Sequence, residues 1–290
     1  MRVEDYPEQE PFTRIGALYH EEVLGRAGHL AGHDLFYGDD PYQSLAVFPA
    51  EDSRGNVLCF MHGGGWTNGY KEWMSFMAPA VNRIGATFVS IGYRLAPAHV
   101  FPAGFDDCCD AIAMVCQKVA AFGGDPGRIF IGGHSAGGHY AALMGLRTDW
   151  QASRDVSVDV IRGVLPVSGT FEFGEGSGLS MRPRFLGPED SGNEAPASPV
   201  NHVRSGAPPF LVAWGDNDFP HLVRQASTFV DALRANRVDA TQLILEDCDH
   251  LGASYACGDD DGSWIRAAAG FMEKPPRSGQ EYTAPEPSAQ

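Results

Sequence analysis

Continuous apolar runs alternate along the chain with stretches in which apolar residues recur every three or four positions. The continuous runs predict buried strands at residues 56–61, 86–91, 128–132, 163–167, 210–214 and 241–245. The periodic stretches predict helices at residues 71–84, 105–122, 136–146, 221–235 and 264–272. Strands that are apolar on both faces and separated by helices indicate a mostly parallel central sheet with helices on both faces, an α/β fold.

Two segments break this alternation. Residues 1–40 carry weak helical periodicity and no strong strand, and residues 170–208 are rich in Gly, Pro and Ser without a clear period. A loop of that length within a compact domain is usually functional or partly disordered. We expect residues 1–273 to form a single domain. We also expect both segments to form a small cap over the mouth of its active site. Residues 274–290 are polar and contain several prolines, which predicts a disordered tail.

Charge and cysteine content narrow the class of protein. The chain carries a net charge of −16 with a pI near 4.9, which argues against nucleic acid or an anionic membrane as a partner. No apolar stretch approaches the length of a membrane span, and the acidic N-terminus lacks the features of a secretory signal. The six cysteines include the adjacent pair Cys108 and Cys109 and form no CxxC or Cys/His ladder. These features predict reduced thiols, a cytoplasmic protein and no metal site.

The motif with the most specific chemistry is Gly-His-Ser-Ala-Gly at residues 133–137, directly after a predicted strand and directly before a predicted helix. A serine on such a sharp turn exposes its hydroxyl and needs small residues two positions away on either side. The N–H groups that follow, at a helix N-terminus, point towards developing negative charge. A glycine-flanked serine in an ordinary loop is the alternative, but the strand and helix around it favour Ser135 as a nucleophile.

A second motif, His-Gly-Gly-Gly-Trp at residues 62–66, also follows a predicted strand. Acyl transfer needs backbone donors close to the developing oxyanion, and glycines let the backbone approach. We expect the N–H groups of Gly64, Gly65 and Ala136 to form this oxyanion hole. A phosphate-binding loop is disfavoured because neither a GK[ST] sequence nor a GxGxxG spacing is present.

The remaining members of a catalytic triad follow from chain order, which in such folds is Ser, acid, His. His250 is the only histidine beyond the last predicted strand, and it is therefore the expected general base. The acid should follow the strand at residues 210–214, where both Asp216 and Asp218 qualify. Chemistry of this kind needs no metal and no organic cofactor.

Several motifs together resemble a known family. The sequences HGGGW, GYRLAP and GHSAGG at residues 62–66, 92–97 and 133–138 are similar to those of the hormone-sensitive-lipase-like esterases of the α/β-hydrolase superfamily. Tyr37-Gly38 and the GDND sequence that begins at Gly215 look like kynurenine formamidases (arylformamidases), although those usually carry HGGYW, from which Gly65 departs. The resemblance spans roughly residues 35–270. It implies an α/β-hydrolase fold, Asp218 as the triad acid, and a carboxylesterase or an arylformamidase.

Other residues near these motifs have both a structural and a functional interpretation. Trp66, His134 and Phe171 are candidates for substrate binding, and ordinary packing is an equally good interpretation. His62 is expected to brace its loop by hydrogen bonding. The expected partner is a small ester or amide substrate, with the protein a monomer or a homodimer. A different class of function, a catalytically silent hydrolase fold acting as a ligand receptor, is disfavoured because serine, acid and histidine candidates are all present.

Overall fold

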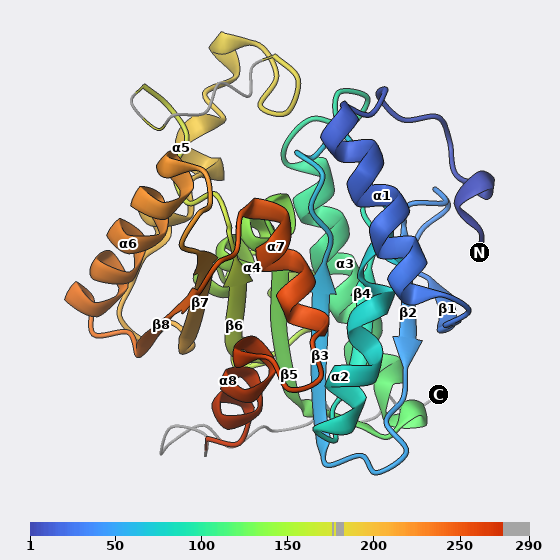
Figure 1. Ribbon diagram of the computed structural model, residues 1–290. Helices are drawn as coiled ribbons and strands as arrows, with labels where there is room; N and C mark the ends of the chain where they lie inside the picture. Colours follow the sequence, from blue (N-terminus) through green and yellow to red (C-terminus); the bar gives the residue numbers. More distant parts are fainter. Residues whose placement is uncertain (176, 178–182, 275–290) are drawn as a thin grey trace.

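The structure, a computed structural model, describes residues 1–175, 177 and 183–274. Within these residues one sheet has eight strands in the order β1-β2-β4-β3-β5-β6-β7-β8. Strands β3 to β8 pair with one another in parallel, whereas β2 is antiparallel to both of its neighbours, β4 and the edge strand β1 (Figure 1). The strands are β1 (His33–Phe36), β2 (Ser44–Phe48), β3 (Gly55–Met61), β4 (Thr87–Ile91), β5 (Gly124–His134), β6 (Ile161–Val167), β7 (Phe210–Gly215) and β8 (Ala240–Leu245).

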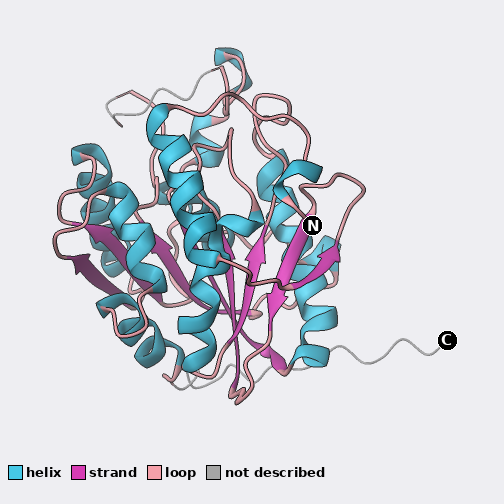
Figure 2. Ribbon diagram, turned by 45° about the vertical axis from the view of Figure 1, so that its right-hand side comes forward, coloured by secondary structure: helices cyan, strands magenta, loops and turns pink. Residues whose placement is uncertain are grey.

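Helices cover both faces of this sheet. Helices α2 and α8 lie in front of the sheet in Figure 1, and α3 and α4 lie behind it; Figure 2 shows the same layers from a second direction. The α-helices are α1 (Arg14–Ala27), α2 (Ala78–Arg83), α3 (Ala103–Lys118), α4 (Ala136–Leu146), α5 (Glu194–Ala197), α6 (Pro220–Ala235), α7 (His250–Tyr255) and α8 (Ser263–Met272). Short 3-10 helices are Val3–Asp5, Lys71–Met77, Val119–Phe122, Ala152–Arg154, Glu189–Ser191, Pro199–His202 and Ala256–Gly258. The predicted α/β-hydrolase architecture is confirmed.

The structure differs from the sequence-based expectation at the edge of the sheet. Strand β1 lies within the segment for which no strong strand was expected, and β2 follows it. The sequence of β1, HDLF, is polar and only partly buried, because an edge strand faces solvent. Its strand conformation comes from pairing, with Leu35 opposite Leu45. The expectation of no strand was wrong because β1 is stabilised by pairing with β2, and the hydrophobic pattern of residues 33–36 does not indicate that pairing.

A second difference concerns the helix expected at residues 71–84. The chain forms a 3-10 helix over Lys71–Met77, and the α-helix begins only at Ala78. Pro79 occupies the first turn of α2. Proline has no N–H to donate and is tolerated in a first turn but not in a helix interior, so the α-helix starts just before it.

Register brings the two glycine-containing motifs together. Met61 at the end of β3 is paired with Gly133 in β5, so the segment at residues 62–66 and the serine turn emerge side by side. Strand β7 ends at Gly215 and is paired there with Leu245 of β8, so the segments carrying Asp218 and His250 emerge from the same edge. The carboxyl ends of these parallel strands therefore gather all the candidate catalytic segments.

The two segments expected to form a cap have different surroundings. Helix α1 packs against the Lys71–Met77 segment, where the indole N–H of Trp73 donates to Nδ1 of His20 at 2.9 Å. Helix α5 lies above the sheet in Figure 1 and packs on the domain, where Nε2 of His139 in α4 lies 2.7 Å from the carbonyl oxygen of Ala197. Part of the 170–208 segment (176, 178–182) and the expected tail beyond Lys274 lie outside the described residues. Over the residues that are described, no helix is both long and apolar enough to cross a membrane.

Candidate active site

Ser135 occupies a sharp turn between β5 and α4. Its backbone has a φ of 55° and a ψ of −115°, an uncommon conformation for a residue with a side chain, and its N–H donates to the carbonyl of Val167 at 2.9 Å. A Cβ at Gly137 would lie 2.1 Å from the carbonyl oxygen of Met61, so this position admits only glycine. The strain that this backbone carries is characteristic of functional turns and exposes the hydroxyl.

Three side chains from three segments form a continuous hydrogen-bonded relay. Nε2 of His250 lies 3.0 Å from Oγ of Ser135, and Nδ1 of the same ring lies 2.9 Å from Oδ1 of Asp218. His250 is the first residue of α7, which is capped by the side chain of Asp249 accepting from Gly252. Both distances fall within hydrogen-bond reach, the geometry that a nucleophile, its base and an orienting acid require.

The electrostatics of Asp218 keep it ionised. Burial raises the pKa of this carboxyl, but the hydrogen bond and positive charge of His250 act in the opposite direction, and the net pKa lies below its usual value. The hydroxyl of Ser168, which is 1% exposed, acts on the same carboxylate and also lowers its pKa. Asp216 is exposed and accepts instead from the backbone N–H of Cys248 at 3.2 Å. The structure therefore brings Asp218, and not Asp216, to His250.

The glycine segment at residues 62–66 has the backbone that close approach demands. Gly64 has a φ of 113°, and a Cβ there would lie 2.0 Å from the carbonyl oxygen of Asn68. Gly65 has a φ of 62° and faces open space, with nothing within 4 Å of a Cβ. Ala136 begins α4 directly after Ser135. The expected oxyanion donors thus lie on a loop next to Ser135 and at a helix N-terminus, where anions are stabilised.

His62 braces the start of this segment. Its Nδ1 lies 2.7 Å from the carbonyl oxygen of Gly63, and its ring stacks on Tyr93 with centroids 4.2 Å apart. The hydroxyl of Tyr93 donates to the carbonyl of His62 at 2.8 Å. Burial lowers the pKa of His62 to about 4, so the ring is neutral at neutral pH. These contacts agree with the bracing role expected from the sequence.

The three candidates for substrate contact are all buried. The ring of Phe171, 1% exposed, stacks on Phe229 of α6 with centroids 4.2 Å apart. Trp66, 3% exposed, stacks on Phe185 at 4.4 Å and donates from its indole N–H to Nδ1 of His139. His134 is 2% exposed and contacts the backbone of His250. All three side chains make packing contacts with other described residues. Their contact with a substrate stays a prediction.

Two residues near the relay were not singled out as site residues from the sequence. Phe219 is 51% exposed, and its ring centroid lies 4.9 Å from that of His250. Tyr19 of α1 is buried and bonds to Ser254 in α7. Phe219 directly follows Asp218 in the chain, and this adjacency could have indicated it from the sequence. Tyr19 is more than a hundred residues from Ser135, Asp218 and His250 in the chain, and only the tertiary structure brings it near them.

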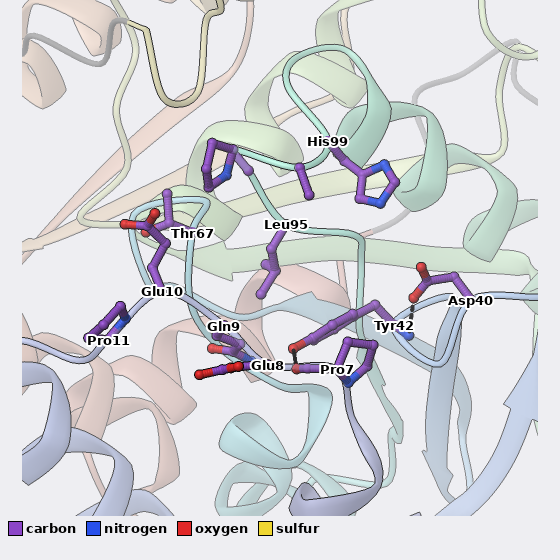
Figure 3. A pocket seen from close by; sticks show the side chains of 13 residues that line it. Pro7, Glu8, Gln9, Glu10, Pro11, Asp40, Tyr42, Thr67, Leu95 and His99 are labelled. Carbon is purple, nitrogen blue, oxygen red and sulfur yellow. Dashed lines mark hydrogen bonds between the residues drawn. The ribbon is translucent and has the colours of Figure 1, made fainter.

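A cavity of about 410 Å³ lies beside the HGGGW segment (Figure 3). Its lining residues are Pro7, Glu8, Gln9, Glu10, Pro11, Asp40, Tyr42, Thr67, Leu95, Ala96, Pro97, Ala98 and His99. The N-terminal segment thus forms one wall and the loop at residues 95–99 another, with Thr67 linking the cavity to the glycine segment. Its ionisable lining is mostly acidic, and the triad residues are not part of its lining.

Among residues 1–175, 177 and 183–274, no cluster of three or more His, Cys, Asp or Glu is arranged to hold a metal ion. The six cysteines are unpaired thiols.

The fold is that of an α/β hydrolase, and the relay lies at the carboxyl ends of its parallel strands. The family model described as alpha/beta hydrolase fold matches residues 58–253. Esterase LipC of Mycobacterium tuberculosis is 33% identical over 95% of this chain and 71% of its own length. The chain therefore belongs to the α/β-hydrolase fold family, and its esterase relatives agree with the hormone-sensitive-lipase-like type that its motifs resemble.

Other relatives extend this picture. Isoprenylcysteine alpha-carbonyl methylesterase ICME of Arabidopsis thaliana is 28% identical, and the match covers 73% of this chain and 54% of that protein. Among solved structures, an esterase from Pyrobaculum calidifontis superposes with a TM-score of 0.73 at 21% identity, covering 94% of this chain and 93% of that one. At this level of identity the structural likeness shows the fold.

Proposed function

We propose that this protein hydrolyses carboxylic ester bonds of small molecules through an acyl-enzyme on Ser135. The observation that carries the proposal is the relay from Ser135 through His250 to Asp218, with distances of 3.0 and 2.9 Å. Relatives named as esterases support ester substrates.

The geometry supports a defined role for each residue. Ser135 attacks the substrate carbonyl while His250 takes its proton, and the N–H groups of Gly64, Gly65 and Ala136 stabilise the oxyanion. His250 then protonates the leaving group, and water hydrolyses the acyl-enzyme with His250 again acting as base. Asp218 holds the imidazole in the tautomer with its proton on Nδ1 and stabilises the imidazolium. Because its pKa lies below the usual value, this carboxyl stays negatively charged throughout.

An arylformamidase activity is the finer alternative. A formamide is a harder acyl donor with a very small acyl group, and it uses the same machinery. The Tyr37-Gly38 and GDND motifs favour it, and Gly65 in place of the tyrosine of HGGYW disfavours it. Gly65 faces open space, so the position that a tyrosine side chain would fill is empty here.

The test is steady-state hydrolysis of p-nitrophenyl acetate, butyrate and octanoate beside N-formylkynurenine, with the unmodified protein and Ser135→Ala. We expect short esters to give the highest kcat/KM and Ser135→Ala to abolish turnover while leaving the folded protein intact. A much higher kcat/KM for the formamide identifies an arylformamidase instead. Full activity in Ser135→Ala contradicts the proposed nucleophile. If the unmodified protein shows no turnover of any substrate and no labelling by a fluorophosphonate, a catalytically silent receptor is favoured.

A further inference from the structure

Helix α7, which carries His250, is too short to hold its own position. It spans six residues, and helices of that length are not stable in isolation. The placement of the His250 imidazole over Ser135 must therefore come from contacts that other segments make with α7.

One such contact comes from the residue before the nucleophile. Nε2 of His134 lies 2.8 Å from the main-chain carbonyl oxygen of His250, and the two rings have centroids 4.8 Å apart. A carbonyl oxygen only accepts, so Nε2 of His134 carries the hydrogen and donates it. Burial and the nearby His250 lower the pKa of His134 to about 3, which keeps this donor in one neutral form over the working pH range. His134 thus links the serine turn to the backbone of the base.

A second contact comes from helix α1 in the N-terminal segment. The hydroxyl of Tyr19 lies 2.7 Å from Oγ of Ser254, and both residues are buried. Ser254 is four residues after His250, so it lies on the same face of α7 one turn later. The Tyr19 ring also stacks on Tyr255 at 5.7 Å and on His134 at 6.3 Å. One tyrosine therefore contacts both α7 and the residue next to the nucleophile.

We propose that α1 is a positioning element for the general base, with Tyr19 and His134 as the two residues that hold His250 over Ser135. The N-terminal segment, which the sequence predicts to be part of a cap, then also sets the geometry of proton transfer. This proposal rests on the proposed function, since it takes Ser135 and His250 as nucleophile and base. Proton transfer is sensitive to such placement, and a displacement of about 1 Å lowers a rate about a hundredfold.

The test begins with Tyr19→Phe and Ser254→Ala, each of which removes one hydroxyl of the buried pair, and with the double variant. We expect each single variant to lower kcat and kcat/KM on p-nitrophenyl acetate by about tenfold with KM unchanged, the pattern for an interaction that matters only in the transition state. The double variant should lose no more than the larger single loss, because both changes break the same bond. The rate of inactivation by a fluorophosphonate should fall in parallel.

A matched control separates positioning from stability. Tyr6→Phe removes another tyrosine hydroxyl of the N-terminal segment, one that bonds to Glu72 and Lys71 and touches neither α7 nor His134. We expect Tyr6→Phe to lower the Tm while keeping kcat. If Tyr19→Phe also lowers only the Tm and keeps kcat, the positioning role is wrong.

His134 is tested by replacement and rescue. His134→Leu removes the donor to the His250 carbonyl, and we expect kcat to fall by about a hundredfold. His134→Gln keeps an N–H donor at a similar distance from the backbone and should recover kcat to within a few fold of the unmodified protein. Equal activity of the Leu and Gln variants overturns the assignment of His134.

Labelling by the fluorophosphonate distinguishes failure of the proposed function from failure of the positioning role of α1. If the unmodified protein is not labelled at Ser135 by the fluorophosphonate, the proposed function itself fails. If Ser135 is labelled but Tyr19→Phe and Ser254→Ala react at the unmodified rate, only the positioning role of α1 fails.

Discussion

Oδ1 of Asp218 lies 2.9 Å from Nδ1 of His250, although these residues are 32 positions apart in the chain. The Asp218 carboxylate is fully buried, whereas the His250 side chain is 15% exposed. A buried acid bonded to one ring nitrogen leaves the other nitrogen free to face Ser135. This relationship selects between two aspartates that the sequence presented as equals by position.

The selection of the acid is testable with a matched pair of variants. We expect Asp218→Asn to lower kcat by about 10³–10⁴-fold, because the amide favours the wrong imidazole tautomer and cannot stabilise the imidazolium. Asp216→Asn, on the exposed neighbour, should change kcat by less than about tenfold. Steady-state kinetics on p-nitrophenyl butyrate measure both, and a larger loss in Asp216→Asn contradicts the assignment.

The oxyanion segment offers a second matched pair, in which the same substitution meets different surroundings. Gly64→Ala forces a Cβ to within 2.0 Å of the Asn68 carbonyl oxygen, so the loop must move and misplace its N–H donors. We expect kcat to fall by about 10²–10³-fold. Gly65→Ala places its Cβ in open space and keeps the N–H. The φ of 62° costs alanine about 1 kcal/mol, so we expect a loss of kcat that is real but much smaller than that of Gly64→Ala. Both variants are compared by kcat on p-nitrophenyl acetate. If kcat falls equally in both, the clash with the Asn68 carbonyl oxygen is not the reason for the effect of Gly64→Ala.

Buried histidines predict how stability depends on pH. Burial lowers the pKa of His62 and of His139 to about 4, below the ordinary value of 6.5. Between these values the unfolded chain binds protons that the folded protein does not, so the free energy of unfolding decreases as the pH falls from about 6.5 to about 4. From pH 7 to pH 5 each such histidine accounts for about 2 kcal/mol.

Denaturant titrations at pH 7 and pH 5 measure this decrease. His139→Gln, which does not titrate, should show a smaller loss of unfolding free energy between the two pH values than the unmodified protein. An equal loss in both proteins places the pH sensitivity in other groups.

The loop at residues 92–97 is held by an ion pair. The Asp107 carboxylate, fully buried, accepts from the backbone N–H of Arg94 at 2.8 Å and from its guanidinium at 2.7 Å. Asp107→Ala leaves the guanidinium without its partner. Arg94 is 27% exposed and regains part of its hydration, so we expect a loss of about 2–3 kcal/mol, below that of a fully buried pair. Asp106→Ala, whose carboxylate is half exposed beside Arg154, should cost less than about 1 kcal/mol. Thermal or denaturant unfolding compares the two variants, and equal losses argue against the ion pair as the anchor.

Much of the fold was readable from local pattern. The buried stretches of strands β3 to β7 are mostly apolar, and α4, α6 and α8 lie within a residue of the ranges expected for them. A strand that is buried on both faces requires apolar residues at successive positions, so its burial can be predicted directly from the sequence. The edge strand β1 was missed because its four residues are partly exposed and do not form an apolar run. Its strand conformation depends on pairing with β2.

Local sequence pattern predicted the residues proposed to carry the chemistry: a serine on a strand-to-helix turn, a glycine segment after another strand, and a histidine beyond the last strand. These features depend on local backbone conformation, which is determined by residues that are adjacent in the chain. The tertiary structure decided which aspartate meets His250, that Trp66 and Phe171 are packed among aromatic rings, and that Tyr19 reaches α7. Such contacts join residues far apart in the chain. They depend on register, helix packing and burial, which no local pattern of residues specifies.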